Sequence, residues 1–124
     1  MMKEKFSTQS HDLVFTATAH ACGMKKTLFT HNDTLSNLTQ FAFGKLRSGE
    51  SIPAHIHPTM EEFFFFLKGK GTYVISDTLV ELTPGIAVRI PAGSAHTMHA
   101  DEDLEFVYFG IAISEDDKGQ KNTP

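Results

Sequence analysis

Two histidines separated by one residue, His55 and His57, are the residues of this sequence best suited to do chemistry. Residues i and i+2 of an extended strand project from the same face, so both imidazoles are expected to point the same way. Two carboxylates, Glu61 and Glu62, follow within reach, and His96 lies further along the chain. Three imidazoles and one carboxylate form a ligand set for a divalent transition metal. The sequence therefore indicates a metal site.

Strand alternation distinguishes the two glutamates. Residues 62–67 contain four consecutive phenylalanines and are typical of a buried strand. On such a strand Glu62 shares a face with Phe64 and Phe66, whereas Glu61 faces outward, where it can form a surface ion pair. A carboxylate among phenylalanines is costly unless a cation neutralises it. We therefore predict that Glu62 is the carboxylate ligand.

The elements that must position these residues are strands. Short β-branched or aromatic runs alternate with Gly, Pro, Asn and Asp, and no dozen-residue stretch has a 3.6-residue apolar period. The predicted strands are Leu13–Ala19, Lys26–Phe29, Leu38–Leu46, Phe63–Leu67, Thr72–Ser76, Leu79–Leu82, Ala87–Ile90, His96–His99 and Leu104–Ala112. About nine strands with short connections predict an antiparallel sandwich or barrel. We expect one domain over residues 11–113, with flexible polar segments at 1–10 and 114–124.

The residues around the histidines resemble the two motifs of the cupin superfamily. The first motif, G-x5-H-x-H-x3/4-E-x6-G, is matched by Gly49, His55, His57, Glu62 and Gly69. The second, G-x5-P-x-G-x2-H-x3-N, is matched by Gly85, Pro91, Gly93 and His96, but Ala100 replaces its asparagine. The resemblance implies an all-β fold, an antiparallel double-sheet jelly-roll β-barrel. It also implies that His55, His57, Glu62 and His96 bind one divalent transition metal, such as Fe, Mn, Ni, Zn or Co.

An apolar chamber beside the metal is the expected place for a small-molecule ligand. The candidate lining residues are Phe41, Phe43, Phe64, Phe66, Arg89 and Met98, although a place in the core is the favoured interpretation for most of the aromatic ones. An acidic substrate would need a fixed cation, for which Lys45, Arg47 and Arg89 are candidates. Two phenols, Tyr73 and Tyr108, are candidate proton donors.

The other histidines and the cysteine are expected to take no part in the site. His11, His20 and His31 lie in polar surroundings and are expected at the surface, and His99 is out of phase with the interior. The single cysteine, Cys22, cannot form an internal disulfide, which suits the cytoplasm. We expect it to be a small packed residue rather than a reactive thiol.

The composition of the chain argues against two classes of binding partner, nucleic acid and the membrane interior. The net charge of −4 and the lack of a basic run argue against nucleic acid, and no apolar stretch is long enough to span a membrane. A homodimer is expected, because the run 13–19 could extend a neighbour's sheet and the outward Phe63, Phe65 and Leu67 need cover. Two functions stay open. One is a metal-dependent enzyme (dioxygenase, isomerase or lyase) acting on a small organic molecule, and the other is a non-catalytic module that binds a small molecule or sugar.

Overall fold

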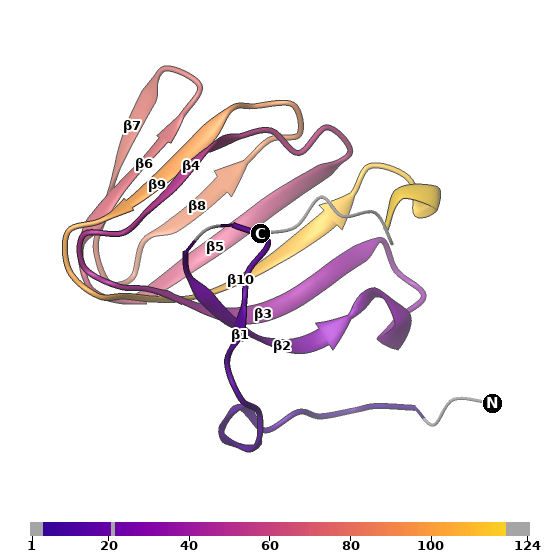
Figure 1. The fold of residues 1–124 in the computed structure, drawn as a ribbon. Helices are drawn as coiled ribbons and strands as arrows, with labels where there is room; N and C mark the ends of the chain where they lie inside the picture. The colour runs from indigo at the N-terminus through magenta and orange to yellow at the C-terminus, as the bar shows by residue number, and fades with distance from the viewer. Residues whose placement is uncertain (1–3, 21, 119–124) are drawn as a thin grey trace.

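Two antiparallel sheets that face each other make up the fold (Figure 1). The computed structural model describes residues 4–20 and 22–118. Within these residues the strands are β1 (Thr16–Ala17), β2 (Met24–Thr30), β3 (Leu38–Leu46), β4 (Ser51–His55), β5 (Met60–Lys68), β6 (Gly71–Ile75), β7 (Thr78–Leu82), β8 (Ala87–Ile90), β9 (His96–Ala100) and β10 (Leu104–Ala112). Three 3-10 turns, η1 (Ser10–Asp12), η2 (His31–Asp33) and η3 (Glu115–Asp117), complete the regular structure.

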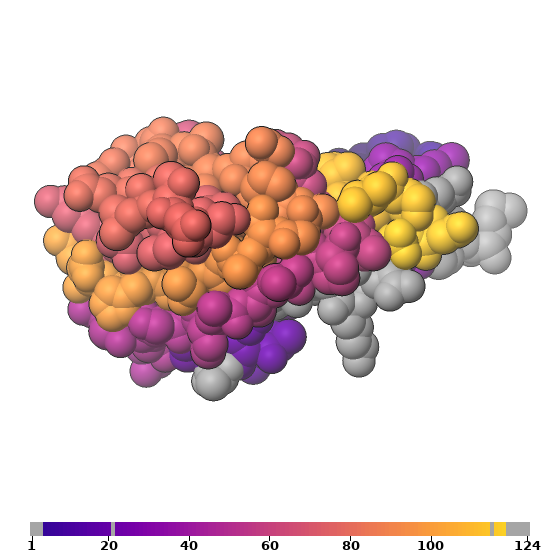
Figure 2. Space-filling view, turned by 90° about the horizontal axis from the view of Figure 1, so that it is seen from above, coloured from indigo at the N-terminus to yellow at the C-terminus, as the bar shows by residue number. Residues whose placement is uncertain are grey.

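The order of the strands explains how residues distant in sequence meet. One sheet has the order β1-β2-β3-β10-β5-β8 and the other the order β4-β9-β6-β7. The chain passes repeatedly from one sheet to the other, which is consistent with the expected jelly roll. Figure 2 shows the molecule from above, with the β6–β7 hairpin (salmon) at one end and the segment after β10 (yellow) at the other.

Alternation along the strands builds the core between the sheets. The inner face of β5 carries Met60, Glu62, Phe64 and Phe66, all at most 3% exposed, and β10 contributes Phe106 and Tyr108. Phe63, Phe65 and Leu67 face the other side, as expected from the sequence.

Two glycines permit close approaches that a side chain would block. Gly69 has a φ of +91°, and a Cβ atom there would collide with the backbone carbonyl of Asp103. On the inner face of β3, a Cβ atom at Gly44 would collide with the ring of Phe106. The close packing of Phe106 on Gly44 therefore requires that the face of β3 that carries Gly44 points into the core.

The strand that carries the first histidine was not among the nine predicted ones. β4 is Ser51–His55, and Pro53 in its middle lowers its apparent strand propensity. Because β4 lies at the edge of its sheet, a proline is tolerated there. At the N-terminus the predicted strand 13–19 is reduced to Thr16–Ala17, which pairs with β2.

Candidate metal centre

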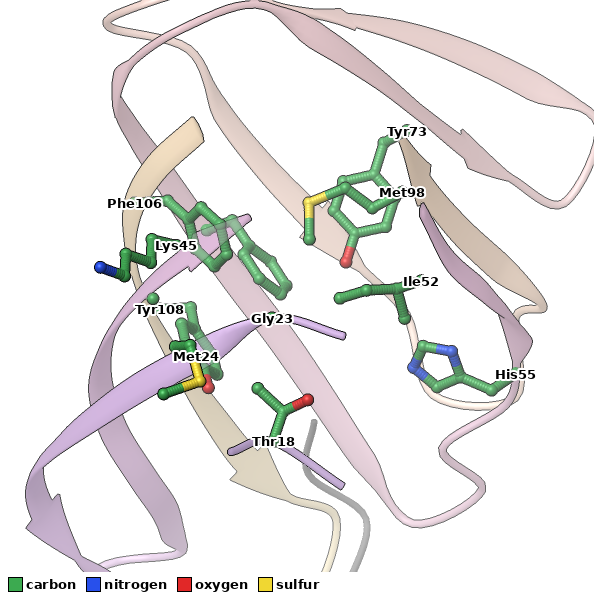
Figure 3. Close-up of a pocket in the computed structure, with 12 residues that line it drawn as sticks. Thr18, Gly23, Met24, Lys45, Ile52, His55, Tyr73, Met98, Phe106 and Tyr108 are labelled. Carbon is green, nitrogen blue, oxygen red and sulfur yellow. The ribbon is translucent and has the colours of Figure 1, made fainter. Parts of the chain in front are cut away.

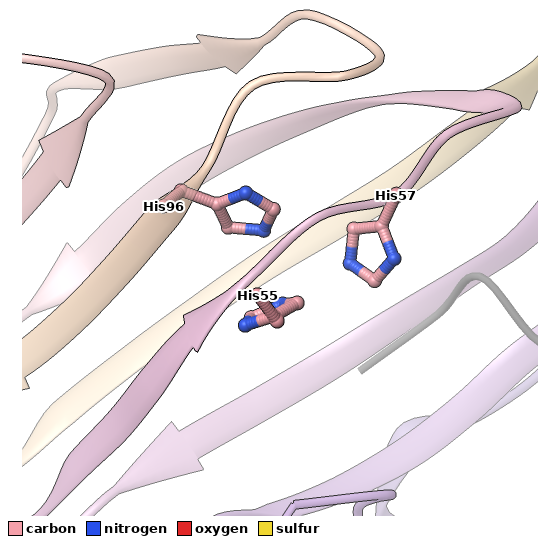
Figure 4. A group of neighbouring side chains, drawn as sticks. All are labelled: His55, His57 and His96. Carbon is pink, nitrogen blue, oxygen red and sulfur yellow. The ribbon is translucent and has the colours of Figure 1, made fainter.

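Three histidines, one on β4, one on β9 and one in the connection between β4 and β5, converge on one point (Figure 4). His55 ends β4 and is paired in register with His96, which begins β9, while His57 lies in the connection to β5. One ligand nitrogen from each ring lies within 4.8 Å of the other two. The strand continues only as far as His55, so His57 reaches the same space from a loop rather than by strand alternation.

Backbone carbonyls fix the orientation of two of the rings. The Nδ1 atom of His55 lies 2.9 Å from the carbonyl oxygen of Pro53, and that of His96 lies 2.9 Å from the carbonyl of Ser94. A carbonyl oxygen only accepts hydrogen bonds, so each Nδ1 carries the proton and donates it. The Nε2 lone pairs are therefore left for a metal, which is the arrangement that metal-binding histidines use.

Glu62 completes the cluster from β5. Its carboxylate is 1% exposed, and its Oε1 atom lies 3.1 Å from Nε2 of His57 and 3.6 Å from Nε2 of His96. The facing predicted from the sequence is correct. Glu61 points outward and accepts a hydrogen bond from Arg89 at 2.6 Å.

The protonation of the cluster follows from burial. Burial raises the pKa of Glu62 to about 8, and the nearby His55 and Lys25 oppose this shift. Burial also lowers the pKa of His57 and of His96 to about 4. At neutral pH the histidines are therefore neutral and the carboxyl group holds a proton, which a metal ion would displace.

The unsatisfied atoms of the cluster fit a metal. The Nε2 atoms of His55, His57 and His96 and the Oε1 atom of Glu62 are buried and have no hydrogen-bond partner. Leaving such atoms unsatisfied is unfavourable, and a single cation among them would satisfy all four. Three imidazole nitrogens and one carboxylate oxygen suit a divalent transition metal.

A fourth histidine lies beside this cluster. The ring of His20, in the segment between β1 and β2, packs against the ring of His55 with centroids 4.4 Å apart. Its Nε2 atom is buried without a hydrogen-bond partner, and burial lowers its pKa to about 4. The expectation of a surface position for His20 was wrong, because the segment folds back over the end of β4.

A polar pair that the sequence did not reveal lies on the inner face of the six-stranded sheet. Lys25 is opposite the inward-facing Gly44 in the β2–β3 register, and its Nζ atom donates to Oε1 of Gln40 at 3.1 Å. Gln40 is 5% exposed, and its Nε2 atom has no hydrogen-bond partner. Lys25 points inward because it is paired with Gly44, whose face of β3 lies toward the core. The sequence does not show which residues of β2 and β3 are paired, so this direction could not be predicted.

A small cavity lies between the two sheets (Figure 3). A cavity of about 10 Å³ lies among side chains of both sheets, including His55, Phe64, Tyr73, Met98 and Tyr108. Such a volume holds about one water molecule. Phe64 and Met98 are among the residues that line this cavity, whereas Phe66 is fully buried in the core.

The other predicted pocket residues lie on the outside of the six-stranded sheet. In β3 the inward residues are Ala42, Gly44 and Leu46, so Phe41 and Phe43 point away from the metal cluster. Their predicted facing was wrong because the small residues, not the aromatic ones, make room for Phe106. Arg89 also faces outward in its ion pair, and Phe41 and Arg89 line an outer groove of about 480 Å³.

Four further residues considered in the sequence analysis, Lys45, Arg47, His99 and Cys22, are not part of the histidine cluster. Lys45 lies with its Nζ atom 4.0 Å from the ring centroid of Phe15, and Arg47 is exposed. His99 contacts Asp101 with nearly half of its side chain exposed. Burial raises the pKa of Cys22, which keeps its thiol protonated and agrees with a packed, unreactive residue.

The fold and the histidine cluster together define a class of protein, a double-sheet jelly roll with a candidate metal centre. The family model described as "Cupin domain" matches residues 42–112, more than half of the chain. The protein therefore belongs to the cupin family. No curated protein sequence matches it.

Several solved structures share the fold. A predicted oxalate decarboxylase from Thermotoga maritima has a TM-score of 0.79 and 21% identity, over 86% of this chain and 99% of that one. KdgF from Halomonas sp. has a TM-score of 0.74 and 18% identity, over 91% and 97% of the two chains. Ectoine synthase from P. lautus has a TM-score of 0.76 and 12% identity, over 91% and 83%. At these identities the likeness establishes the fold alone. Among the described residues, no helix is long and apolar enough to cross a membrane.

Proposed function

We propose that this cupin binds one divalent transition metal through His55, His57, His96 and Glu62, and acts as a metal-dependent enzyme on a small organic molecule. The observation that carries the proposal is the set of four buried, unsatisfied ligand atoms around one point. Fe, Mn, Ni, Zn and Co all accept this donor set. Solved structures with the same fold include proteins named as a predicted oxalate decarboxylase, an ectoine synthase and a polyketide cyclase, which supports an enzyme.

The four ligands and the groups that orient them would have separate roles in the site. A bound metal would supply Lewis-acid or redox chemistry at the coordination positions that the four protein ligands leave open. The carbonyls of Pro53 and Ser94 hold the imidazoles of His55 and His96 in their binding orientation. Glu62 would give up its proton and place one negative charge against the cation. The phenylalanines beside Glu62 exclude water and strengthen these electrostatic interactions.

Metal analysis tests the first half of the proposal. Protein purified without chelator should contain one equivalent of a transition metal, measured by inductively coupled plasma mass spectrometry. His57→Ala and Glu62→Ala should lose most of it, whereas His99→Ala, which alters a histidine on the outer face, should keep it. Full occupancy in both cluster variants would refute the assignment.

A non-catalytic binding module is the second candidate, and the narrow interior favours it. The cavity of about 10 Å³ beside His55 leaves no room for a sizeable substrate unless the part of the chain that carries His20, which packs on His55, moves. To separate the two functions, the metal-loaded protein would be incubated with a panel of small organic acids and sugars and followed by NMR. Conversion of any compound, lost in His57→Ala, supports the enzyme, and binding without conversion supports the module.

We also propose that the protein forms a homodimer through the outer face of the six-stranded sheet. This face carries a groove of about 480 Å³ lined by Phe41, Phe63, Phe65, Arg89 and Phe109, among others. Phe65 and Phe109 are 43% and 36% exposed, which is unusual for neighbouring aromatic residues on a free surface. A cytoplasmic location stays a prediction from the single cysteine.

A further inference from the structure

We propose that His20 forms a hydrogen bond with the molecule that fills the open coordination position of the candidate metal centre. His20 would thereby select ligands that carry a second polar atom beside the atom that binds the metal. This inference rests on the proposed metal site and adds a residue that contacts its ligand. His20 belongs to neither of the two histidine motifs and precedes the residues that the family model matches.

The first argument is the direction of the His20 side chain. Its ring centroid lies 4.4 Å from that of His55, and the rings of the three histidine ligands lie 4.1, 4.7 and 5.1 Å from one another. The ring of His20 is also near enough to His57 and His96 to interact with them electrostatically. Its Nε2 atom is buried and has no hydrogen-bond partner within residues 4–20 and 22–118. This nitrogen therefore lies on the side of the histidine cluster rather than of the solvent.

The second argument is the distance of His20 from the cluster. The group of ligand nitrogens that lie within 4.8 Å of one another contains His55, His57 and His96 but not His20. An atom bound to a transition metal lies about 2 Å from it, and a hydrogen bond to the next polar atom adds about 3 Å. A nitrogen outside the group of ligands, yet packed against one of them, is placed to contact a molecule bound to the metal rather than the metal itself.

The third argument is that hydrogen bonds hold His20 in this place. The backbone N–H of His20 donates to the hydroxyl oxygen of Thr18 at 3.1 Å, and this hydroxyl donates to the carbonyl of Cys22 at 2.9 Å. The thiol of Cys22 donates to the carbonyl of Ser51 at 3.0 Å. Ser51 begins β4, the strand that carries His55, so the chain around His20 is tied to that strand. A group held in advance loses little conformational entropy when it contacts a ligand.

A surface pocket gives the ligand room beside His20. This pocket has a volume of about 260 Å³, and His20, Lys45, Arg47 and Glu50 are among the residues that line it. His20 therefore belongs both to this pocket and, through its contact with His55, to the surroundings of the metal centre. A ligand that extends from the metal toward the pocket would bring its second polar atom to His20.

The chemistry of the imidazole defines the class of ligand. A neutral imidazole can carry its proton on either nitrogen, so Nε2 can donate to a lone pair of the bound molecule. A buried nitrogen without a partner is unfavourable, and this hydrogen bond would satisfy it. The expected ligand is thus a small molecule with a hydrogen-bond acceptor next to its metal-binding atom. Azide is a suitable probe, because one terminal nitrogen binds a metal while the other can accept a hydrogen bond.

The experiment uses the full chain loaded with Co²⁺, whose visible absorption reports its ligands. Azide would be titrated into the wild type, His20→Phe, His20→Ala, His20→Gln and His11→Phe. His20→Phe keeps an aromatic ring for packing on His55 but has no hydrogen-bonding atom, whereas His20→Gln offers an N–H group. His11→Phe is the matched control, because the side chain of His11 is mostly exposed and contacts Asp12. Cobalt content and cobalt affinity would be measured separately in each variant.

We expect His20→Phe and His20→Ala to bind azide at least five times more weakly than the wild type while retaining cobalt. His20→Gln should recover part of this affinity, and His11→Phe should behave as the wild type. Unchanged azide affinity in His20→Phe would overturn the proposal, because the ring would then act by packing alone. Loss of cobalt in His20→Phe, or a cobalt-loaded wild type that binds no azide, would also overturn it. Failure of the wild type to bind cobalt would instead overturn the proposed function. If His20→Phe does not fold, His20→Ala and His20→Gln decide the result.

Discussion

The Nε2 atom of His57 lies 3.1 Å from the Oε1 atom of Glu62, and both atoms are buried. A neutral imidazole nitrogen and a carboxylate oxygen at this distance repel each other unless a proton or a cation lies between them. Burial favours the proton in the metal-free protein, because it raises the pKa of Glu62 to about 8 and lowers that of His57 to about 4. A metal ion would replace this proton. Two predictions follow from the protonated state of Glu62 in the metal-free protein.

Metal binding at pH 7 should release about one proton. Glu62 is protonated at this pH in the metal-free protein, whereas His57 and His96 are already neutral and have no proton to lose. Isothermal titration calorimetry with Co²⁺ or Zn²⁺, in buffers of different ionisation enthalpy, measures the number. The variant Glu62→Gln should release none and bind the metal at least ten times more weakly. Release of three protons, or of none in the wild type, would contradict the assigned protonation.

The stability of the metal-free protein should be greatest near pH 6.5. Between about pH 4 and 6.5 the unfolded chain binds protons on histidines that stay neutral when folded, so stability rises with pH. Between pH 6.5 and 8 the folded chain keeps the proton of Glu62 that the unfolded chain has lost, so stability falls, by on the order of 2 kcal/mol.

Urea unfolding in the presence of a chelator measures this profile. Glu62→Gln serves as the control, since an amide has no proton to lose and its stability should not fall between pH 6.5 and 8. A wild-type stability that keeps rising to pH 8 would show that the carboxyl group is ionised in the metal-free protein.

The convergence of the three histidines could be predicted from motif spacing, and the inward direction of Glu62 from strand alternation. Alternation places Glu62 with Phe64 and Phe66 on the inner face of β5, and the structure shows this face to be buried. The same rule failed for Phe41 and Phe43. Alternation shows which residues share a face of β3, but the face that points inward is decided by packing against β10, where Gly44 makes room for Phe106.

The residues that border the cluster were not predictable for a different reason. Lys25 lies on a strand whose sequence alone is compatible with either facing, and only its pairing with Gly44 directs it inward. His20 lies in a connection between two strands, and the path of such a connection is set by tertiary contacts. Its contact with His55 joins positions 35 residues apart, which no local pattern encodes.

The ring of His20 should slow the escape of the metal. It packs on His55 and covers one side of the cluster, so His20→Ala should open this side to solvent. We expect metal transfer to an excess of chelator to be several times faster in His20→Ala, with metal stoichiometry unchanged. Stopped-flow absorbance with a coloured chelator measures the rate. His11→Ala is the control, because the side chain of His11 is mostly exposed and contacts Asp12 instead. Equal transfer rates in all three proteins would show that His20 does not guard the site.

The outer aromatic face should determine the oligomeric state. A charge placed in the groove would be buried at the interface without a partner, so Phe65→Glu should convert a dimer into a monomer. Leu79→Glu is the matched control, since Leu79 is 60% exposed on β7 in the other sheet. Analytical ultracentrifugation at micromolar concentration distinguishes the two states. Both variants should keep their metal, because neither touches the histidine cluster. A monomeric wild type, or a Phe65→Glu variant that stays dimeric, would exclude this face as the interface.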